Sequence, residues 1–225
     1  ISADGEYIVI GGKNRKVSLF ERSDDEPLWT TVALDHDIQS IAISENGTYI
    51  AAGVRLSTIG RVYLFNNTGD GEWEWRSDVN GHVYAIDISA DGRYIAAGSA
   101  SGNTGNKVYF YSRTSDNPVW EYLTGNKVSS LSLSADGGTL AVASDYVIYL
   151  FNTSSSELQW SYNSGSTINS VAVSANSNYV AAGGDNNHLY YFDSNSSVFV
   201  WRVSVGGDVD HVTLSTDGDY LLVGE

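Results

Sequence analysis

The chain has 225 residues, of which 42% are hydrophobic and 17% charged, so it is too apolar for a disordered protein and long enough to bury a sizeable core. Its 12 Lys and Arg against 27 Asp and Glu give a net charge of -15, which opposes binding to nucleic acid or to an anionic membrane surface. No apolar run approaches the roughly 20 residues of a membrane-spanning helix, and the absence of Cys excludes disulfides, thiolate catalysis and Cys-containing metal sites.

One motif recurs from the first residue to the last. It is an apolar-alternating run followed by Ser-x-Asp-Gly or a close variant. Its copies end at Gly5, Gly47, Gly92, Gly137, Ser177 and Gly218, which by subtraction are 42, 45, 45, 40 and 41 positions apart. A tryptophan follows in each complete unit, at Trp29, Trp75, Trp120, Trp160 and Trp201. The motif and the tryptophan recur in the same order over five units, which indicates a repeat protein.

Within the unit that spans 82–126, alternation of apolar residues predicts four short strands, at 83–89, 93–98, 107–112 and 118–123. We name the four strands of any unit a, b, c and d, and the connections between them by the strands that they join. Asp91-Gly92 supplies the positive φ of a tight hairpin between strands a and b. No stretch shows a helical period of useful length.

Four strands in every 40 to 45 residues is the length of a propeller blade, and the whole chain resembles the WD40-like and quinoprotein (PQQ)-like β-propeller families. The resemblance implies an all-β propeller of four-stranded antiparallel blades, with five near-complete blades and a partial sixth. We expect a single domain over 1–225, with blades at about 1–36, 37–81, 82–126, 127–166, 167–207 and 208–225.

The two ends of the chain offer the same part of a blade twice, because 1–12 aligns with 214–225. We therefore expect the chain to be part of a longer propeller with an exposed edge that is available for self-association. The Trp-Asp ending of strand c in WD40 proteins is replaced here, for example by Tyr111-Ser112, and Gly-His occurs only at 81–82. The sequence thus resembles a divergent propeller of this superfamily.

The periodic tryptophans have two interpretations. A Trp buries a large apolar area, so the side chains are expected to dock against the neighbouring blade. The alternative is an aromatic binding cage. Strand a carries large residues on one face and mostly small ones on the other, as expected where blades crowd near the axis.

Catalytic candidates are few. The four His are His36, His82, His188 and His211, and none has a metal-ligand spacing, so we predict no metal site and no cofactor. Asp210-His211 is the best acid-base pair but lacks a nucleophile and a third partner. Asn66–Glu72 is expected to be a solvated loop rather than a calcium site. Quinoprotein dehydrogenases resemble larger rings and often carry adjacent cysteines, which this chain lacks.

The charges are distributed unevenly over the two faces of such a propeller. The bc and da connections share one face, the bc/da face, and carry Lys13, Arg15, Lys16, Arg55, Arg61, Lys107 and Lys127. The longest bc connections are predicted at 54–60 and 99–106, with Leu56 and Ile59 exposed. We expect the channel mouth on this face to be formed by Gln39, Tyr84, Asn169, Asp210 and His211.

These features favour a noncatalytic binding or assembly scaffold that docks a protein or an anionic glycan on the bc/da face. The alternative is a quinoprotein-like or hydrolytic propeller enzyme whose remaining blades are missing. Four Asn-x-Ser/Thr sequons start at Asn46, Asn66, Asn152 and Asn195. With the acidic, Ser- and Asn-rich composition, they resemble prokaryotic, particularly archaeal, surface repeat proteins, and an extracellular or cell-surface location is expected.

Overall fold

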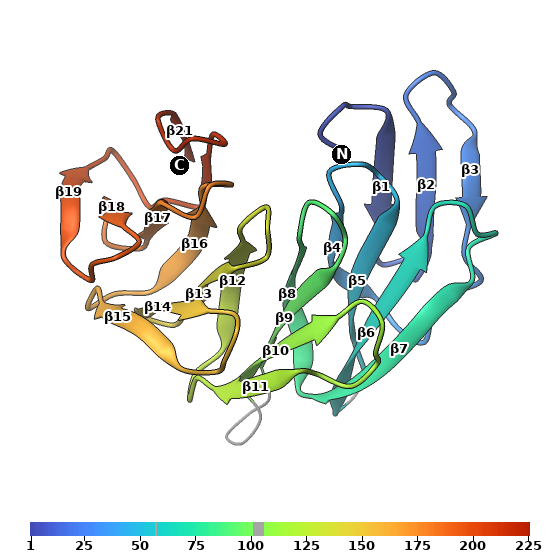
Figure 1. Cartoon of the computed structure of the whole chain (residues 1–225), viewed down its shortest axis with the longest axis horizontal. Helices are drawn as coiled ribbons and strands as arrows, with labels where there is room; N and C mark the ends of the chain where they lie inside the picture. Colours follow the sequence, from blue (N-terminus) through green and yellow to red (C-terminus); the bar gives the residue numbers. More distant parts are fainter. Residues whose placement is uncertain (57, 101–105) are drawn as a thin grey trace.

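The computed structural model describes residues 1–56, 58–100 and 106–225. In these ranges the chain forms strands, turns and loops, and the strands build six antiparallel sheets that follow one another around an arc (Figure 1). Four of the sheets have four strands, the first has three and the last has two. The predicted fold is confirmed: the chain is an all-β propeller with five near-complete blades and a partial sixth.

Each sheet is one blade. Blade 1 contains β1 (Tyr7–Gly11), β2 (Val17–Glu21) and β3 (Pro27–Thr30). Blade 2 contains β4 (Ile38–Ile43), β5 (Tyr49–Arg55), β6 (Ile59–Asn66) and β7 (Trp73–Asn80). Blade 3 contains β8 (His82–Ile88), β9 (Tyr94–Ala100), β10 (Lys107–Ser112) and β11 (Trp120–Leu123). Blade 4 contains β12 (Val128–Leu133), β13 (Thr139–Ser144), β14 (Val147–Asn152) and β15 (Leu158–Asn163). Blade 5 contains β16 (Ile168–Val173), β17 (Tyr179–Gly184), β18 (His188–Asp193) and β19 (Phe199–Ser204), and blade 6 contains β20 (His211–Leu214) and β21 (Leu221–Gly224).

Strand a of each four-stranded blade lies innermost in the arc. β4, β8, β12, β16 and β20 contact one another in turn, whereas β7, β11, β15 and β19 form the outer edge (Figure 1). The strands predicted in 82–126 agree with β8 to β11 within two residues at every end. The prediction succeeds because each strand alternates inward and outward side chains between strong turn signals.

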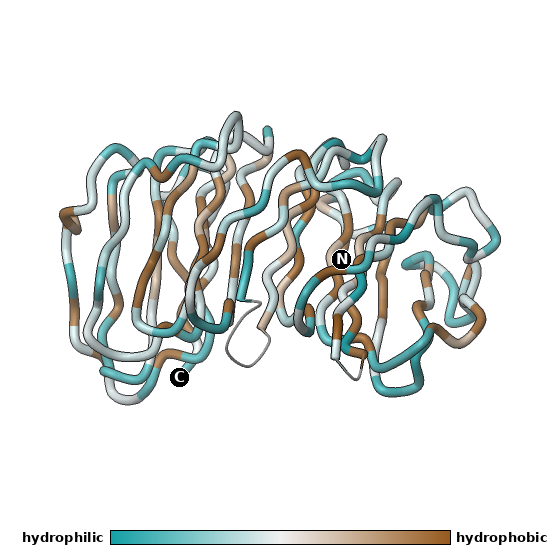
Figure 2. The backbone as a smooth tube through the Cα atoms, turned by 90° about the horizontal axis from the view of Figure 1, so that it is seen from below, coloured by the Kyte–Doolittle hydropathy of each residue, from teal (hydrophilic) through white to brown (hydrophobic). Residues whose placement is uncertain are grey.

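The apolar core consists of layers between neighbouring blades, so most of the hydrophobic residues lie along the strands and the polar residues at their ends (Figure 2). In the first layer, Ile50 and Ala52 of blade 2 pack with Val17 and Leu19 of blade 1. The close approach of neighbouring blades requires small residues in strand b. A Cβ on Gly53 would lie 2.4 Å from a methyl carbon of Val83 in the next blade.

A tyrosine at the start of strand b packs on the ab hairpin of the following blade. A Cβ on Gly137 would lie 2.5 Å from the ring of Tyr94, and the same contact joins Tyr7 to Gly47, Tyr49 to Gly92 and Tyr179 to Gly218. Thr139 takes the place of the tyrosine in blade 4, and the next hairpin has Ser177 in place of glycine. The hairpin glycine and the tyrosine therefore form one joint between blades.

Four of the repeated tryptophans form a second contact between blades. The indole N–H groups of Trp29, Trp75, Trp120 and Trp160 donate hydrogen bonds to the carbonyl oxygens of Asn67, Arg113, Thr153 and Ser194 respectively. Each acceptor follows strand c of the next blade. This confirms the docking interpretation for these four side chains. Trp201 is 39% exposed, because the two described strands of blade 6 do not include a strand c.

One of the two expectations about long connections needs correction. The segment 54–60, predicted as a long loop, is mostly strand, since β5 ends at Arg55 and β6 begins at Ile59. The second long connection, 99–106, includes 101–105, which lie outside the described residues. Within the described part of the chain, no helix has the length and apolarity to cross a membrane.

Candidate functional site: the bc/da face

A β-bulge recurs near the start of strand a. In β4, β8, β12 and β16 the pairing with strand b skips one residue, at Gln39, Tyr84, Ser129 and Asn169. A bulge leaves one residue outside the ladder and re-aims its side chain. Four blades thus present four different side chains from the same backbone position, and three of them are residues that the sequence placed at the channel mouth.

A polar depression of about 730 Å³ lies where blades 3, 4 and 5 meet on the bc/da face. We call it the axial depression, and it is lined by Ala100, Asn106, Gly125, Asn126, Lys127, Ser129, Asp145, Thr167 and Asn169. Lys127 and Asp145 supply its only formal charges among these residues. Amides and hydroxyls make up most of the remainder, so the depression can exchange hydrogen bonds with a polar ligand.

The bulge side chains differ in how firmly they are engaged. Ser129 donates to the carbonyl of Ile168 at 2.8 Å, and Asn169 donates to the Asp185 carboxylate at 2.8 Å and the Val209 carbonyl at 3.2 Å. These two side chains therefore join their blade to the next one.

Gln39 and Tyr84 are the bulge residues that remain presented outward. Gln39 is exposed. Half-buried Tyr84 has the Lys127 ammonium 4.2 Å from its ring centroid, a cation–π contact between blades 3 and 4. Lys127 itself remains exposed at the edge of the axial depression.

Asp210 and His211, the acid-base candidates, lie at the start of β20 in the last blade, and both are exposed. The Asp210 backbone N–H donates to the Gly224 carbonyl at 2.9 Å. Over the described ranges, no hydrogen bond or ion pair joins their side chains, and no three His, Asp or Glu side chains lie close enough to hold a metal ion. The structure thus offers no catalytic constellation at this pair.

The predicted basic residues divide into two groups. Lys13, Arg15, Lys16 and Arg55 are exposed, and none is in the ion pairs found among the described residues. We call these four residues the basic patch. The patch comes from the bc turn of blade 1 and from the end of β5, and both segments border the da connection at 31–37. The Leu34 N–H of this connection donates to the Arg15 carbonyl at 2.7 Å, and the Arg55 N–H donates to the Asp37 carbonyl at 3.3 Å.

Arg61 is engaged within the protein. Its guanidinium pairs with Asp35 and Asp78, and its side chain is only 12% exposed. The Asp78 carboxylate raises the pKa of Arg61, while the hydrogen bond from the Tyr63 hydroxyl lowers the pKa of Asp35. Arg76 approaches Asp35 at 3.9 Å. The sequence did not reveal this ion-pair network, because Asp35 and Arg61 are 26 positions apart and show no joint motif.

Lys107 and the two apolar residues of the predicted long loop are also less available than the sequence indicated. Lys107 pairs with Glu121 at 2.5 Å, and this contact raises the pKa of its ammonium. Leu56 and Ile59 were expected to be exposed but are half-buried. Leu56 packs against the core layer between blades 1 and 2, and its backbone N–H donates to the Ile59 carbonyl at 2.9 Å.

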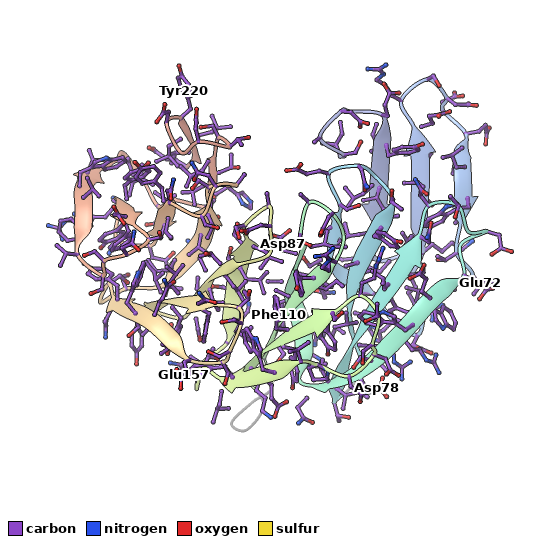
Figure 3. All side chains as sticks on the ribbon, viewed as in Figure 1. Glu72, Asp78, Asp87, Phe110, Glu157 and Tyr220 are labelled. Atoms are coloured by element: carbon purple, nitrogen blue, oxygen red, sulfur yellow. The ribbon has the colours of Figure 1, made fainter. Side chains whose placement is uncertain are left out.

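Asp87 is a half-buried acid on the inner side of the arc (Figure 3). Its carboxylate accepts the Leu133 N–H of the next blade at 2.8 Å and the Ile88 N–H at 2.9 Å. Burial raises the pKa of Asp87 to about 6. The sequence distinguishes this position, because Asp87 is an acid where other blades have the uncharged Ala42, Ser132 and Ala172 at the same place in strand a. Its hydrogen bonds are to backbone N–H groups, which gives it a role at the blade joint.

Comparison with known proteins agrees with this fold. A family model described as a family of unknown function (DUF5711) matches residues 1–223, so the chain belongs to that family. A chain in the crystal structure of the mitotic checkpoint complex superposes with a TM-score of 0.80 at 19% identity, over 99% of this chain and 72% of that one. This likeness shows the fold, a WD40-like propeller. No curated protein sequence matches the chain.

Proposed function

We propose that the chain is a noncatalytic binding module that holds a protein partner on its bc/da face, around the axial depression. The observation that carries the proposal is the repeated bulge. One backbone device presents Gln39 and Tyr84 outward on the same face as the depression, whereas the fold itself needs only small or hydrogen-bonding side chains there, such as Ser129. A rigid scaffold with variable presented side chains suits recognition.

The composition of the site supports binding rather than catalysis. The axial depression offers amides, hydroxyls, Lys127 and Asp145, but no nucleophile with an adjacent base. Asp87, the acid with the most strongly raised pKa in the described ranges, is occupied by backbone N–H groups. We therefore prefer the binding module to the enzyme alternative, which stays a prediction. A WD40-like propeller in a multiprotein complex offers an analogy for protein docking at the level of the fold.

Site-specific photo-crosslinking tests the proposal. A photoreactive phenylalanine analogue is placed at Gln39 or Tyr84, with Val198 as control, because Val198 is 71% exposed but lies in a cd connection on the opposite face. Irradiation in cells should give discrete adducts from the first two positions only, and Asn126→Ala in the axial depression should reduce them. The same adducts at all three positions, or no adducts at Gln39 and Tyr84, would contradict the proposal.

Five further interpretations of the sequence stay predictions. They are the organisation of 1–225 as one domain, the quinoprotein-like character, the surface location, the choice of a protein over an anionic glycan, and self-association through the exposed edge. The crosslinking experiment bears on the partner directly, since an adduct digested by protease identifies a protein and distinguishes it from a glycan.

A further inference from the structure

We propose that the basic patch (Lys13, Arg15, Lys16 and Arg55) binds a short acidic segment of a protein partner. This inference rests on the proposed function and names the chemistry of the partner. The patch gathers four of the 12 basic residues of a chain with net charge -15. All four side chains are exposed, and they lie along the border of one da connection.

The ionised groups in and around this da connection do not neutralise the patch. Asp35 is held by Arg61 and Tyr63, and Asp78 is held by Arg61, with Arg76 alongside. These two carboxylates and two guanidinium groups sum to zero charge. The nearby Asp37 has its carboxylate 3.7 Å from the His36 ring. The four positive charges of the patch thus outnumber the single remaining carboxylate of this connection.

The fold does not require basic residues at this turn. The bc turn of blade 5 has the same backbone: Asn187 has φ 57° where Arg15 has φ 62°. The hydrogen bond from the Lys16 N–H to the Asn14 side chain is matched by one from the His188 N–H to the Asn186 side chain, both at 3.2 Å. Yet the turn of blade 5 begins with Asp185 and contains no Lys or Arg.

Arg15 lies in the left-handed region, which Asn and Gly adopt more readily than Arg. An Arg at a turn position that favours Asn or Gly motivates the hypothesis that its side chain is kept for a function. The turn is also held in place, because the Gly12 and Arg15 carbonyls accept N–H groups of Ile38 and Leu34 at 3.3 and 2.7 Å. A fixed backbone lowers the ordering cost of binding.

The negative charge of the whole chain favours a short acidic ligand over a long one. On the same face, the bc and da connections of blades 5 and 6 carry the exposed Asp185, Asp208 and Asp210, and the net charge of -15 repels any long polyanion that extends beyond the patch. A few consecutive Asp or Glu residues contact the patch without reaching the acidic surfaces. Arg and Lys of the patch form charge-assisted hydrogen bonds with such carboxylates.

The test measures binding of a 12-residue peptide that contains six Glu and Asp residues, against an isosteric Gln and Asn peptide and a heparin oligosaccharide of equal charge. Isothermal titration is run at two salt concentrations. The acidic peptide should bind more tightly than the Gln and Asn peptide and the heparin oligosaccharide, and added salt should weaken the binding of the acidic peptide. Lys13→Glu with Arg55→Glu should weaken it about tenfold or more.

The matched control is Arg93→Glu with Arg202→Glu, which changes the charge equally on other surfaces. It should leave the dissociation constant within about twofold, because charges beyond a Debye length are screened. Lys13→Arg with Arg55→Lys should retain binding. Circular dichroism confirms that each variant is folded.

Equal weakening by both double reversals, equal affinity for the Gln and Asn peptide, or tighter binding of heparin would overturn the inference. Absence of peptide binding together with crosslinks from Gln39 and Tyr84 would overturn the inference and leave the proposed function standing. Peptide binding by the patch without those crosslinks would keep docking on the bc/da face but overturn the role proposed for the axial depression.

Discussion

Trp120 and Trp201 occupy the same position in blades 3 and 5, but their surroundings differ. Trp120 stacks on Phe110 at 5.1 Å, packs near Phe151 of blade 4 at 5.5 Å, and donates to the Thr153 carbonyl at 2.9 Å. Trp201 stacks on Tyr191 of its own blade at 4.9 Å and is 39% exposed. The two joints differ in the next blade, because blade 4 supplies a strand c and the described strands of blade 6 do not.

The comparison shows that a blade of this protein is completed by its neighbour. Tyr94 is covered by the following hairpin, whereas Tyr220, its counterpart in blade 6, is 77% exposed. Identical residues at identical repeat positions therefore contribute different amounts to stability. In a repeat protein the stability resides in the interfaces between neighbours as well as in each unit.

The largest difference is expected between the two tryptophans. Trp120→Ala should lower the free energy of unfolding by about 3–5 kcal/mol, since it removes a large side chain from an interface. Trp201→Ala should cost less, about 1–2 kcal/mol, because its ring stacks on Tyr191 of its own blade and lacks the contact with a following blade. Denaturant melts of both variants measure this, and hydrogen exchange should show blades 2 and 4 loosened by the first. Equal midpoints for the two variants would refute the comparison.

A second test uses two glycines with the same backbone. Gly5 and Gly137 both have φ 72°, but an added Cβ meets only Ile1 at 4.0 Å in the first and the Tyr94 ring at 2.5 Å in the second. Gly5→Ala should cost about 1 kcal/mol for the left-handed backbone. Gly137→Ala should cost about 2–4 kcal/mol, since overpacking adds to the same backbone term. Equal thermal shifts would show that Tyr94 yields without cost.

Asp87 gives a test that depends on pH. Burial raises its folded-state pKa to about 6, above the ordinary 3.8, so the protonated acid stabilises the fold below pH 3.8 and this contribution is lost as the pH rises through about 6. Asp87→Asn keeps a neutral acceptor for the Leu133 N–H. The variant should match the parent at low pH and exceed it by up to about 3 kcal/mol above pH 7. Parallel stability curves across this range would contradict the assignment.

The smallest effect is expected at the joint between blades 4 and 5. Ser132 accepts the Val173 N–H at 3.1 Å, in the place that Asp87 occupies one blade earlier. Ser132→Ala leaves that N–H unpaired and should cost about 1–2 kcal/mol without the pH dependence of Asp87→Asn. Chemical denaturation at pH 5 and pH 8 measures both properties. A cost that changes between these pH values would show that the two joints are coupled.

The sequence by itself determined the fold, because the repeated hairpin and tryptophan set the blade length and the alternation of apolar residues set the strands. It also indicated the positions of Gln39, Tyr84 and Asn169 on strand a, although their role in binding stays a prediction. These features are local: a turn residue, a period of two and a spacing are all readable within one repeat.

Only the tertiary structure decided which of those residues are available. The sequence predicts Arg61 and Lys107 as free surface cations, yet Arg61 pairs with Asp35 of a da connection and Asp78 of β7, and Lys107 pairs with Glu121 of β11. The sequence also predicts Leu56 at an exposed loop tip, although it packs against a core layer. The register bulge that presents Tyr84 is also invisible in the sequence. The physical reason is that ion pairs, burial and strand register depend on which segments meet within and between blades. Partners 14 to 46 positions apart, such as Lys107 with Glu121 inside one blade and Asp87 with Leu133 across two, meet only after the chain has folded.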